Sequence, residues 1–387
     1  MWARSSGVSP SIQAALRPAG QGSFGSPQDL SLGGQTASPP QVAVSPNGTA
    51  IAVWTRSDGT TPVIQAAVKP AGQAGFDAAQ TISQAGRIAT RLQVAVAPDG
   101  TATAVWQRQN DGSTYTIQGA MRPVGAASSG AVQNLSVPEA GRNANVPQVA
   151  VAPDGAATAA WERDDGSRQV IQSATRPAGQ ATFEATENRS QSGQHAFGPQ
   201  VAMGIDGATT IAWRRSDGAT YIPQATTRAA GQLVFGAVQN LAPAGEDVTN
   251  DPQLGVAPDG AVTMAWASAG IIRTATRPAG EAGYTTPMAL SLVGQAADNP
   301  QVAVGLDGAA TAVWERSNGS ELIAQGTGSS ATTYPLTVQS QGPGTVTSSP
   351  TGIACGTGCS ASFPLSSSVT LTATPEPGGA FADWGGS

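Results

Sequence analysis

A segment of fixed length recurs six times in this chain, and the repeat constrains the fold more than any other sequence feature. Its consensus is Gln-Val-Ala-Val-x-Pro-Asp/Asn-Gly-x-Ala-x-x-x-Trp, and the tryptophan follows the glutamine by 13 residues in every copy. The copies span residues 41–54, 93–106, 148–161, 200–213, 253–266 and 301–314, so their starts lie 48 to 55 residues apart. Length variation therefore falls outside a rigid unit, as in arrays built from one supersecondary structure.

Each copy of this segment predicts a β-hairpin. In the first copy Val42 and Val44 alternate with Ala43, which is the period of a strand. The Pro-Asn-Gly that follows favours a tight turn, because proline presets φ while asparagine and glycine tolerate positive φ. The return strand is apolar on both faces, so we expect it to be covered on both sides. We expect the tryptophans that end it to form the blade cores rather than sugar platforms: Trp54, Trp106, Trp161, Trp213, Trp266 and Trp314.

Two further strands follow each hairpin. In the first copy the third strand covers residues 64–69, and the proline after it ends it because proline cannot donate to a ladder. A weaker fourth strand covers residues 76–83. Four antiparallel strands joined by short turns are typical of a propeller blade. The sequence therefore predicts an all-β fold, a six-bladed β-propeller of four-stranded blades, with seven blades as the alternative.

The two ends of the repeat array carry complementary parts of a blade. Residues 2–31 hold a tryptophan and two later strands with no front hairpin, so the chain opens within a repeat, and residues 301–316 hold a front half. We expect the N-terminal strands to pair with the last hairpin and to close a propeller over residues 1–328, because closure removes exposed strand edges. A spare third strand near Ile323 keeps the seven-bladed count open, which would need a front half before Trp2.

The remainder of the chain differs in composition. Residues 329–333 are predicted to be a linker, and residues 334–387 a small Thr/Ser/Val-rich β module. Both cysteines of the chain lie there, in Cys355-Gly-Thr-Gly-Cys359. A turn at the two glycines would bring them within disulfide distance, and a disulfide is favoured over a zinc site because no third or fourth ligand is nearby.

Composition excludes several classes of function. The net charge is −6 and no Lys/Arg cluster occurs, which argues against nucleic-acid binding. The chain lacks a run of 18 apolar residues, so no membrane-spanning segment is expected. It also lacks a phosphate-binding glycine loop before a helix and a metal-ligand cluster, so no cofactor and no metal are expected.

The repeats resemble known propeller families. Pro98 to Trp106 is similar to the Ser-Pro-Asp-Gly signature of TolB-type, WD40-like propellers, and partly resembles the Asp-box of sialidase-like proteins. It departs from the Asp-box because proline precedes the acid and glycine follows it directly. The closer resemblance is to uncharacterised actinobacterial Gln-Val-Ala-Val…Val-Trp repeat proteins, and it covers roughly residues 1–326.

The C-terminal module resembles the divergent internalin-B-type bacterial repeat. The matching segments are residues 344–348, 352–355, 359–363, 369–373 and 381–384. Because that family continues past the last tryptophan into a further strand, we expect the module to be truncated. The resemblance implies an extracellular or cell-surface protein, although residues 1–4 show no signal peptide.

Candidate ligand-binding residues lie in the loop after the second strand of each blade. Arginines stand two residues after the tryptophan, and acids and tyrosines stand nearby on the same expected face. A turn in which arginine and aspartate satisfy each other competes with ligand contact at these positions. The candidates are Arg56, Arg108, Arg163, Asp165, Arg215, Asp217, Arg316, Tyr115 and Tyr221.

No residue set predicts catalysis. The single histidine, His195, has no serine partner in a triad arrangement, and a Gly-x-Ser-x-Gly elbow is absent. We therefore favour a monomeric, non-catalytic binding or scaffold protein that holds a carbohydrate or protein on one propeller face. The alternatives are a carbohydrate-active enzyme of sialidase or lyase type, which would need acids and a tyrosine converging in one funnel, and a purely structural spacer.

Overall fold

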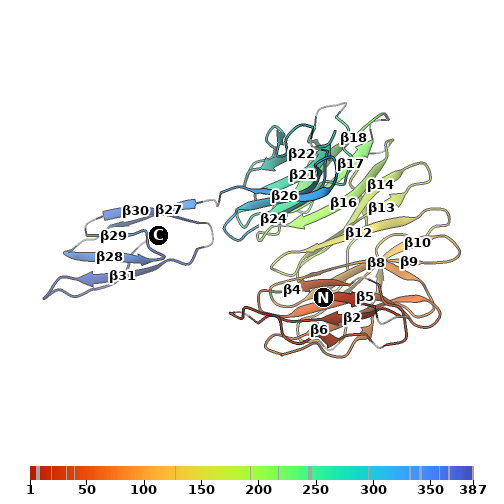
Figure 1. Cartoon of the computed structure of the whole chain (residues 1–387), viewed down its shortest axis with the longest axis horizontal. Helices are drawn as coiled ribbons and strands as arrows, with labels where there is room; N and C mark the ends of the chain where they lie inside the picture. The colour runs from red at the N-terminus through yellow and green to blue at the C-terminus, as the bar shows by residue number, and fades with distance from the viewer. Residues whose placement is uncertain are drawn as a thin grey trace.

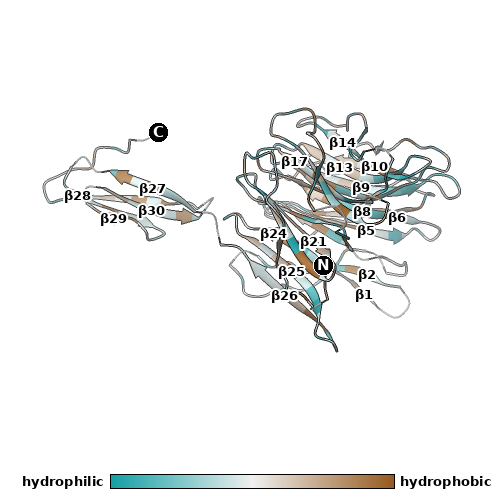
Figure 2. Cartoon of the chain, turned by 90° about the horizontal axis from the view of Figure 1, so that it is seen from above, coloured by the Kyte–Doolittle hydropathy of each residue, from teal (hydrophilic) through white to brown (hydrophobic). Residues whose placement is uncertain are grey.

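The computed structural model shows strands and no helix in the residues that it describes (Figure 1). These are residues 1–5, 9–18, 20–31, 33–38, 40–126, 128–191, 193–216, 218–242, 246–294, 296–330, 333–339, 342–356, 358–364 and 367–385. Strands β1 to β26 form stacked antiparallel sheets, and β27 to β31 form a separate module beside them in Figures 1 and 2. The predicted all-β fold with four-stranded antiparallel blades is confirmed.

Five sheets hold four strands each in the order of the chain. They are β4 (Gln41–Val44), β5 (Ala50–Ser57), β6 (Pro62–Lys69) and β7 (Gln80–Thr81); β8 (Ala89–Val96), β9 (Ala102–Gln109), β10 (Tyr115–Arg122) and β11 (Gln133–Asn134); β12 (Ala144–Val151), β13 (Ala157–Asp164), β14 (Gln169–Arg176) and β15 (Glu187–Asn188); β16 (Ala196–Met203), β17 (Thr209–Ser216), β18 (Tyr221–Arg228) and β19 (Gln239–Asn240); β20 (Gln253–Val256), β21 (Val262–Ser268), β22 (Ile271–Arg277) and β23 (Met288–Ala289).

The Gln-to-Trp segment forms the hairpin between the first and second strands. In the first copy Val42 pairs with Ala52 and Val44 with Ala50. The turn is closed by its own polar atoms, since the Gly48 N–H donates to the Ser45 carbonyl at 2.9 Å and the Thr49 N–H to the Asn47 side chain at 2.8 Å. Gly48 has φ of 86°, a conformation that glycine adopts without cost.

The sheets stack face to face around the tryptophans. Each tryptophan of the second strand packs on the third strand of the preceding sheet, as Trp54 does on Ile12 and Trp106 on Ile64. All six repeated tryptophans are at most 3% exposed. In three sheets the indole N–H also donates to a glutamine of the third strand, at 3.0 to 3.2 Å. The core is therefore a row of similar interfaces between consecutive sheets.

The first and last sheets hold three strands each, and here one expectation is corrected. The first contains β1 (Trp2–Arg4), β2 (Ser11–Ala14) and β3 (Gln28–Asp29), and the last contains β24 (Ala297–Val304), β25 (Ala310–Ser317) and β26 (Leu322–Gly328). The expected pairing of the N-terminal strands with the last hairpin does not occur among the described residues. The reason is that β26 itself pairs along β25, so the edge that an N-terminal strand would need is occupied.

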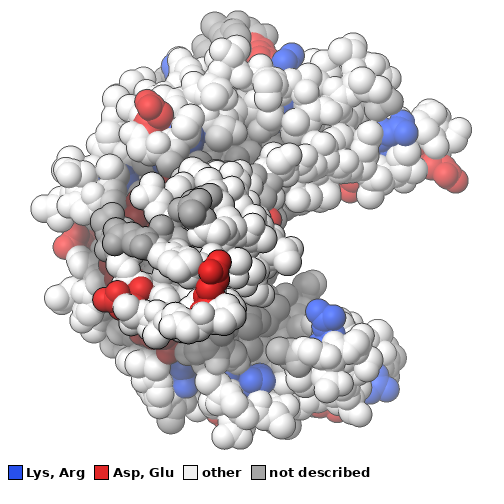
Figure 3. Space-filling view, turned by 90° about the vertical axis from the view of Figure 1, so that its left-hand side faces the viewer, with Lys and Arg blue, Asp and Glu red and all other residues white. Residues whose placement is uncertain are grey.

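The sheets therefore form an arc with an opening (Figure 3). At its ends, positions that are buried elsewhere are exposed. Val313 is 47% exposed, whereas Val53 and Val105, the equivalent residues before the tryptophan, are 0% exposed. Trp2 is likewise 38% exposed. The end sheets present apolar faces because no further sheet is stacked on them.

The C-terminal module consists of two small sheets. Strand β27 (Thr333–Gln339) pairs with β30 (Gly358–Pro364), and β28 (Gly344–Ser349) lies between β29 (Ala354–Cys355) and β31 (Thr370–Pro375). Its buried core contains Val338, Val346, Ile353 and Phe363. Two of the linker residues, 331 and 332, lie outside the described residues.

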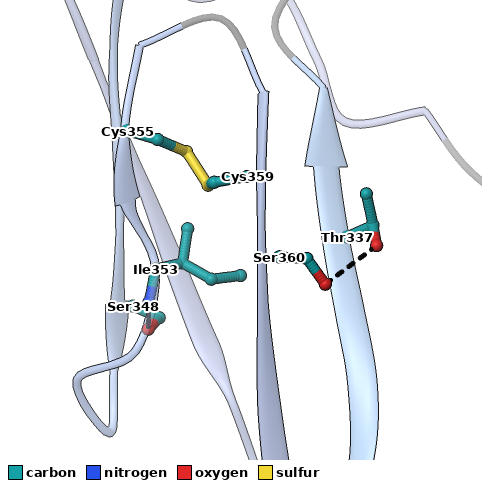
Figure 4. Close-up of a disulfide and its surroundings, with 6 residues drawn as sticks. All are labelled: Thr337, Ser348, Ile353, Cys355, Cys359 and Ser360. Atoms are coloured by element: carbon teal, nitrogen blue, oxygen red, sulfur yellow. Dashed lines mark hydrogen bonds between the residues drawn. A yellow bond between two sulfur atoms is a disulfide. The ribbon is translucent and has the colours of Figure 1, made fainter.

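The predicted disulfide between Cys355 and Cys359 is present (Figure 4). It joins β29 to β30, with 6.0 Å between the two Cα atoms. Nearby, the Ile353 N–H donates to the Ser348 hydroxyl at 2.9 Å. The bond thus closes the short loop between the two small sheets.

Candidate functional site

The five arginines proposed from the sequence occupy one register position in five sheets. Each lies on the second strand, opposite an alanine that begins the first strand or, for Arg56, forms an isolated bridge before it: Arg56 opposite Ala37, Arg108 opposite Ala89, Arg163 opposite Ala144, Arg215 opposite Ala196 and Arg316 opposite Ala297. They are distributed one to a sheet along the arc. They do not converge on a common point.

Local partners hold two of these arginines. Arg108 donates to the Asn110 side chain at 2.9 Å and to the Gln84 side chain at 3.1 Å. Arg163 is 5% exposed and lies 3.4 Å from the Glu139 carboxylate. Burial lowers the pKa of the Arg163 guanidinium, and the Glu139 carboxylate opposes that change. The contacts with Gln84 and Glu139 join the end of the second strand to the connection that precedes the first strand of the same sheet.

Asp165 caps the turn that contains it. Its carboxylate accepts the N–H groups of Ser167 and Arg168, both at 2.8 Å. These two hydrogen bonds lower the pKa of Asp165. The equivalent Asp58 is bonded in the same way by the backbone of Thr60 and Thr61. The last acid of the set, Asp217, lies outside the described residues.

The two tyrosines stand at the start of their third strands. The Tyr115 N–H donates to the Asn143 side chain and the Tyr221 N–H to the Asp247 side chain, both at 2.9 Å. Only Tyr221 belongs to an aromatic group, since its ring meets that of Phe197 edge-on at 6.0 Å between centroids. Tyr221 therefore lies next to the cluster described below, whereas Tyr115 lies two sheets away from it.

The position directly after each tryptophan is not among the candidates predicted from the sequence. The frame around it repeats, but this residue changes in chemistry from sheet to sheet: Thr55, Gln107, Glu162, Arg214, Ala267 and Glu315. Three of these side chains reach the following sheet. Gln107 donates to the Ala144 carbonyl at 3.1 Å, Glu162 accepts the Gly198 N–H at 2.8 Å, and Arg214 lies 2.8 Å from Asp251. The signal that could have revealed these positions is a residue that varies in chemistry while the residues around it repeat. We call these positions, one to a sheet, the row.

Two of these contacted residues, Ala144 and Gly198, lie at irregularities of the first strands. The pairing of first and second strands shifts between Thr90 and Gln93, and equivalent shifts occur in three other sheets. A bulge of this kind re-aims side chains and is common beside functional sites. Within three of the bulges Arg91, Val146 and Asn299 have positive φ, between 48° and 51°.

Opposite charges converge at the bulge of the sheet β16–β19. The Gly198 N–H donates to Glu162, while the Asp251 carboxylate lies directly against the Gly198 Cα, so that a Cβ there would be 1.8 Å from Asp251 Oδ1. Arg214 forms its ion pair with Asp251, and their side chains are 29% and 35% exposed. Three consecutive sheets thus contribute Glu162, Arg214 and Asp251 to one cluster.

Glu162 is the electrostatically unusual member of this cluster. Burial raises its pKa, and the neighbouring Asp251 carboxylate raises it further. The Gly198 N–H, Arg214 and Arg91 act in the opposite direction without cancelling the rise. A carboxyl group of this kind can donate as well as accept hydrogen bonds near the pH at which it titrates.

Aromatic rings adjoin the same cluster. The Arg214 guanidinium carbon lies 5.3 Å from the Tyr221 ring centroid and 5.9 Å from that of Phe197. The His195 ring stacks on Phe197 at 5.6 Å, and His195 Nδ1 accepts the Gln169 N–H at 3.2 Å. The histidine therefore has a structural partner on each side. The cluster combines carboxylates, a guanidinium and ring surfaces.

A pocket continues the row at the sheets β4–β7, β8–β11 and β12–β15. Its volume is about 300 Å³. It is lined by the bulge residues Arg91, Leu92, Val146 and Pro147, by Ser38 and Thr55, and by the repeated glutamines Gln41, Gln93 and Gln148. The positive charge of Arg91, which lines this pocket, also acts to lower the pKa of Glu162. The repeated glutamines therefore contribute to a solvent-accessible surface.

Neither a metal-holding group nor a membrane-spanning helix occurs among the residues that the structure describes. No group of three or more His, Cys, Asp or Glu residues there is arranged to hold a metal ion. In the same part of the chain, no helix has the length and apolarity that a membrane crossing requires. Basic side chains lie singly on the described surface seen in Figure 3.

The stacked four-stranded antiparallel sheets define the chain as a β-propeller protein. No protein-family model matches it, and no curated protein matches its sequence. Among solved structures it is similar to a protein of unknown function from Dyadobacter fermentans, with a TM-score of 0.46 and 13% identity over 76% of this chain and 94% of that one.

Two further similar structures are those of a polysaccharide lyase and of a protease domain. One is an ulvan lyase of a polysaccharide lyase family, with a TM-score of 0.49 and 8% identity over 74% of this chain and 77% of that one. The other is the β-propeller domain of the Trilobed protease from Pyrococcus furiosus, described as having an open velcro topology, with a TM-score of 0.45 and 8% identity over 76% and 82% of the two chains.

Proposed function

We propose that this chain is a non-catalytic binding protein that holds a carbohydrate on the face of the arc where the first-strand bulges lie. The observation that carries the proposal is the convergence of Glu162, Arg214 and Asp251 from three consecutive sheets at Gly198. The tryptophans and the turns of these sheets repeat, whereas a binding site requires a place where the repeat is broken.

The chemistry of the cluster suits a sugar. Carboxylates and a guanidinium can accept from and donate to neighbouring hydroxyl groups with fixed geometry. The ring faces of Phe197 and Tyr221 supply apolar surface beside these polar groups, which is the usual composition of a small-ligand site. The bulges add a third feature, because they turn residues of the first strand toward this face.

We propose an extracellular or cell-surface location for the protein. The Cys355–Cys359 disulfide supports it, because disulfides persist in oxidising compartments. The resemblance of residues 334–387 to the internalin-B-type repeat implies the same setting. The five arginines at the loop position remain a second proposed contact surface, less favoured because they are spread one to a sheet.

A glycan array with the purified chain tests the binding proposal. Arg214→Ala is expected to weaken binding about tenfold or more, because it leaves Asp251 without its cation. The neighbouring Arg215→Ala distinguishes the two surfaces, and the exposed Arg168 provides the control Arg168→Ala. Loss of binding in Arg215→Ala but not in Arg214→Ala would move the site to the arginine positions. No binding by the wild-type chain would favour a structural spacer.

One observation favours a second candidate, a carbohydrate-active enzyme. Glu162 has a raised pKa beside the second carboxylate of Asp251, an arrangement that general acid catalysis can use. Incubating the chain with each bound polysaccharide and measuring new chain ends or unsaturated products separates the two functions. Turnover that is lost in Glu162→Gln while binding persists would establish the enzyme.

A further inference from the structure

One aromatic position recurs in the loop between the third and fourth strands. It lies four residues before the first residue of the fourth strand in six sheets. Five sheets carry a ring there and one carries a serine. The residues are Phe24, Phe76, Ser129, Phe183, Phe235 and Tyr284.

In every sheet that carries a ring and follows another sheet, the ring packs on that preceding sheet. Phe76 contacts the cluster of Ile12, Ala14 and Leu30, and it is 8% exposed. Phe183 is 6% exposed in the equivalent cluster of its own interface. Phe235 and Tyr284 pack in the next two interfaces.

The exposed ring of the first sheet shows the direction of this packing. Phe24 belongs to the first sheet, which has no preceding sheet, and it is 68% exposed. The ring of each sheet therefore fills a space at the interface with the preceding sheet, and we call such a ring a plug.

The sheet β8–β11 lacks this plug, and a pocket of about 290 Å³ lies in its place. Ser128 and Ser129 line the pocket, together with the residues equivalent to those that surround Phe76. Ala66, Val68 and Ile82 correspond to Ala14, Leu16 and Leu30, and Ala102, Ala104 and Ala120 correspond to Ala50, Ala52 and Ala67. The pocket thus takes the place that an aromatic ring occupies at the other interfaces, and no ring from the described residues fills it. We call this unfilled space the seat.

A cation without its usual partner adjoins the seat. Arg122 lines the pocket, and its Nε, like those of its equivalents Arg176 and Arg277, is buried without a hydrogen-bond partner among the described residues. The difference lies in the terminal nitrogens, since Nη1 of Arg176 and of Arg277 donates to a carbonyl of the following loop, at 2.9 and 3.0 Å, and the described residues show no such bond for Arg122. Arg228 lies 5.6 Å from the centroid of the ring in its own loop, Phe235. Asp77 is the acidic residue at the same pocket.

We propose that the pocket between the sheets β4–β7 and β8–β11 binds a small molecule that carries one aromatic ring and an anionic group. The ring occupies the seat left by Ser129, and the anionic group pairs with Arg122. This site is separate from the carbohydrate site, because its lining residues come from the inter-sheet core rather than from the bulges.

Phenylacetate is the probe for the anionic ligand and benzyl alcohol for a neutral one. Binding to the full chain is measured by ligand-observed NMR and calorimetry. We expect saturable phenylacetate binding that Ser129→Phe weakens about tenfold or more, because the chain's own ring then fills the seat. Ser129→Ala keeps the pocket open and is expected to bind within about twofold of wild type.

Two further variants keep the test decisive if Ser129→Phe does not fold. Ala66→Leu fills the pocket from the opposite sheet and is expected to weaken both probes. Arg122→Gln is expected to weaken phenylacetate about fivefold while benzyl alcohol changes by less than about twofold. Absence of saturation at millimolar phenylacetate, or equal binding by Ser129→Phe, Ala66→Leu and wild type, would overturn the proposal.

Discussion

At the scale of single residues, the repeat separates structural from functional positions. The repeated tryptophans are buried between consecutive sheets, and the aspartates Asp58 and Asp165 are hydrogen-bonded within their own turns. The residue after each tryptophan varies in chemistry, and in three sheets its side chain contacts the following sheet. Glu162 is the clearest case, since it is partly buried, accepts the Gly198 N–H and has a raised pKa. No local sequence pattern marks this glutamate, because its partners lie 36 and 89 residues further along the chain.

Glu162→Gln is expected to increase the free energy of unfolding at pH 7 and to leave it nearly unchanged at pH 4. The folded-state pKa lies above the ordinary 4.5, so the wild-type protein loses stability as the pH rises from 4.5 through the raised value. Glutamine carries no such charge and still offers an oxygen to Gly198. Urea denaturation of both proteins across this pH range is the measurement. A variant that is less stable at pH 7 would contradict this assignment of the charge.

At the scale of elements, the interfaces between sheets follow a complementary size rule. Val105 of one sheet meets Ala159 of the next, whereas the small Ala160 meets the large Ile211. Large residues therefore face small ones, as close packing requires. The hairpins and their turns could be predicted from the sequence because they depend on neighbours in the chain. The pairing of sizes across an interface could not, because it depends on which sheet stacks on which.

Phe183→Ser is expected to cost about 3–5 kcal/mol of folding free energy, since it removes a buried ring and leaves a cavity. It would reproduce at the next interface the pocket that Ser129 leaves in the sheet β8–β11. Thermal or urea unfolding measures the cost. Phe24→Ser is the matched control, because Phe24 is 68% exposed and its loss should change stability by less than about 0.5 kcal/mol. Equal effects of the two substitutions would refute the role of the ring as a plug.

At the scale of the whole molecule, the sheets of the arc are arranged as a linear array. Each sheet contacts its sequence neighbours, so stability is expected to be a sum of sheets and interfaces. A closed propeller depends on its blade number, whereas an open arc can lose one repeat without breaking a ring. The exposed faces at Val313 and Trp2 are the consequence of that openness.

Deletion of residues 93–147 is expected to give a folded, shorter arc. It places Ala159 against Val53, a small residue against a large one, and lets Phe183 enter the seat that is otherwise empty. Deletion of residues 148–199 is the contrasting variant, because it places Ile211 against Val105 and overpacks the interface, at a cost of about 1–3 kcal/mol. Circular dichroism and small-angle scattering with thermal unfolding compare the two. Unfolding of both variants would favour a closed ring in solution.

The sequence by itself determined the blade, the all-β class and the disulfide. These follow from strand periodicity, turn chemistry and short cysteine spacing, which act over a few residues. Only the tertiary structure decided that β26 occupies the edge of β25, so that the arc stays open at its ends. It also brought Glu162, Arg214 and Asp251 together and left a seat at Ser129. The cluster and the seat arise between sheets, where contacts join residues more than thirty positions apart, and patterns within a few residues carry no information about them.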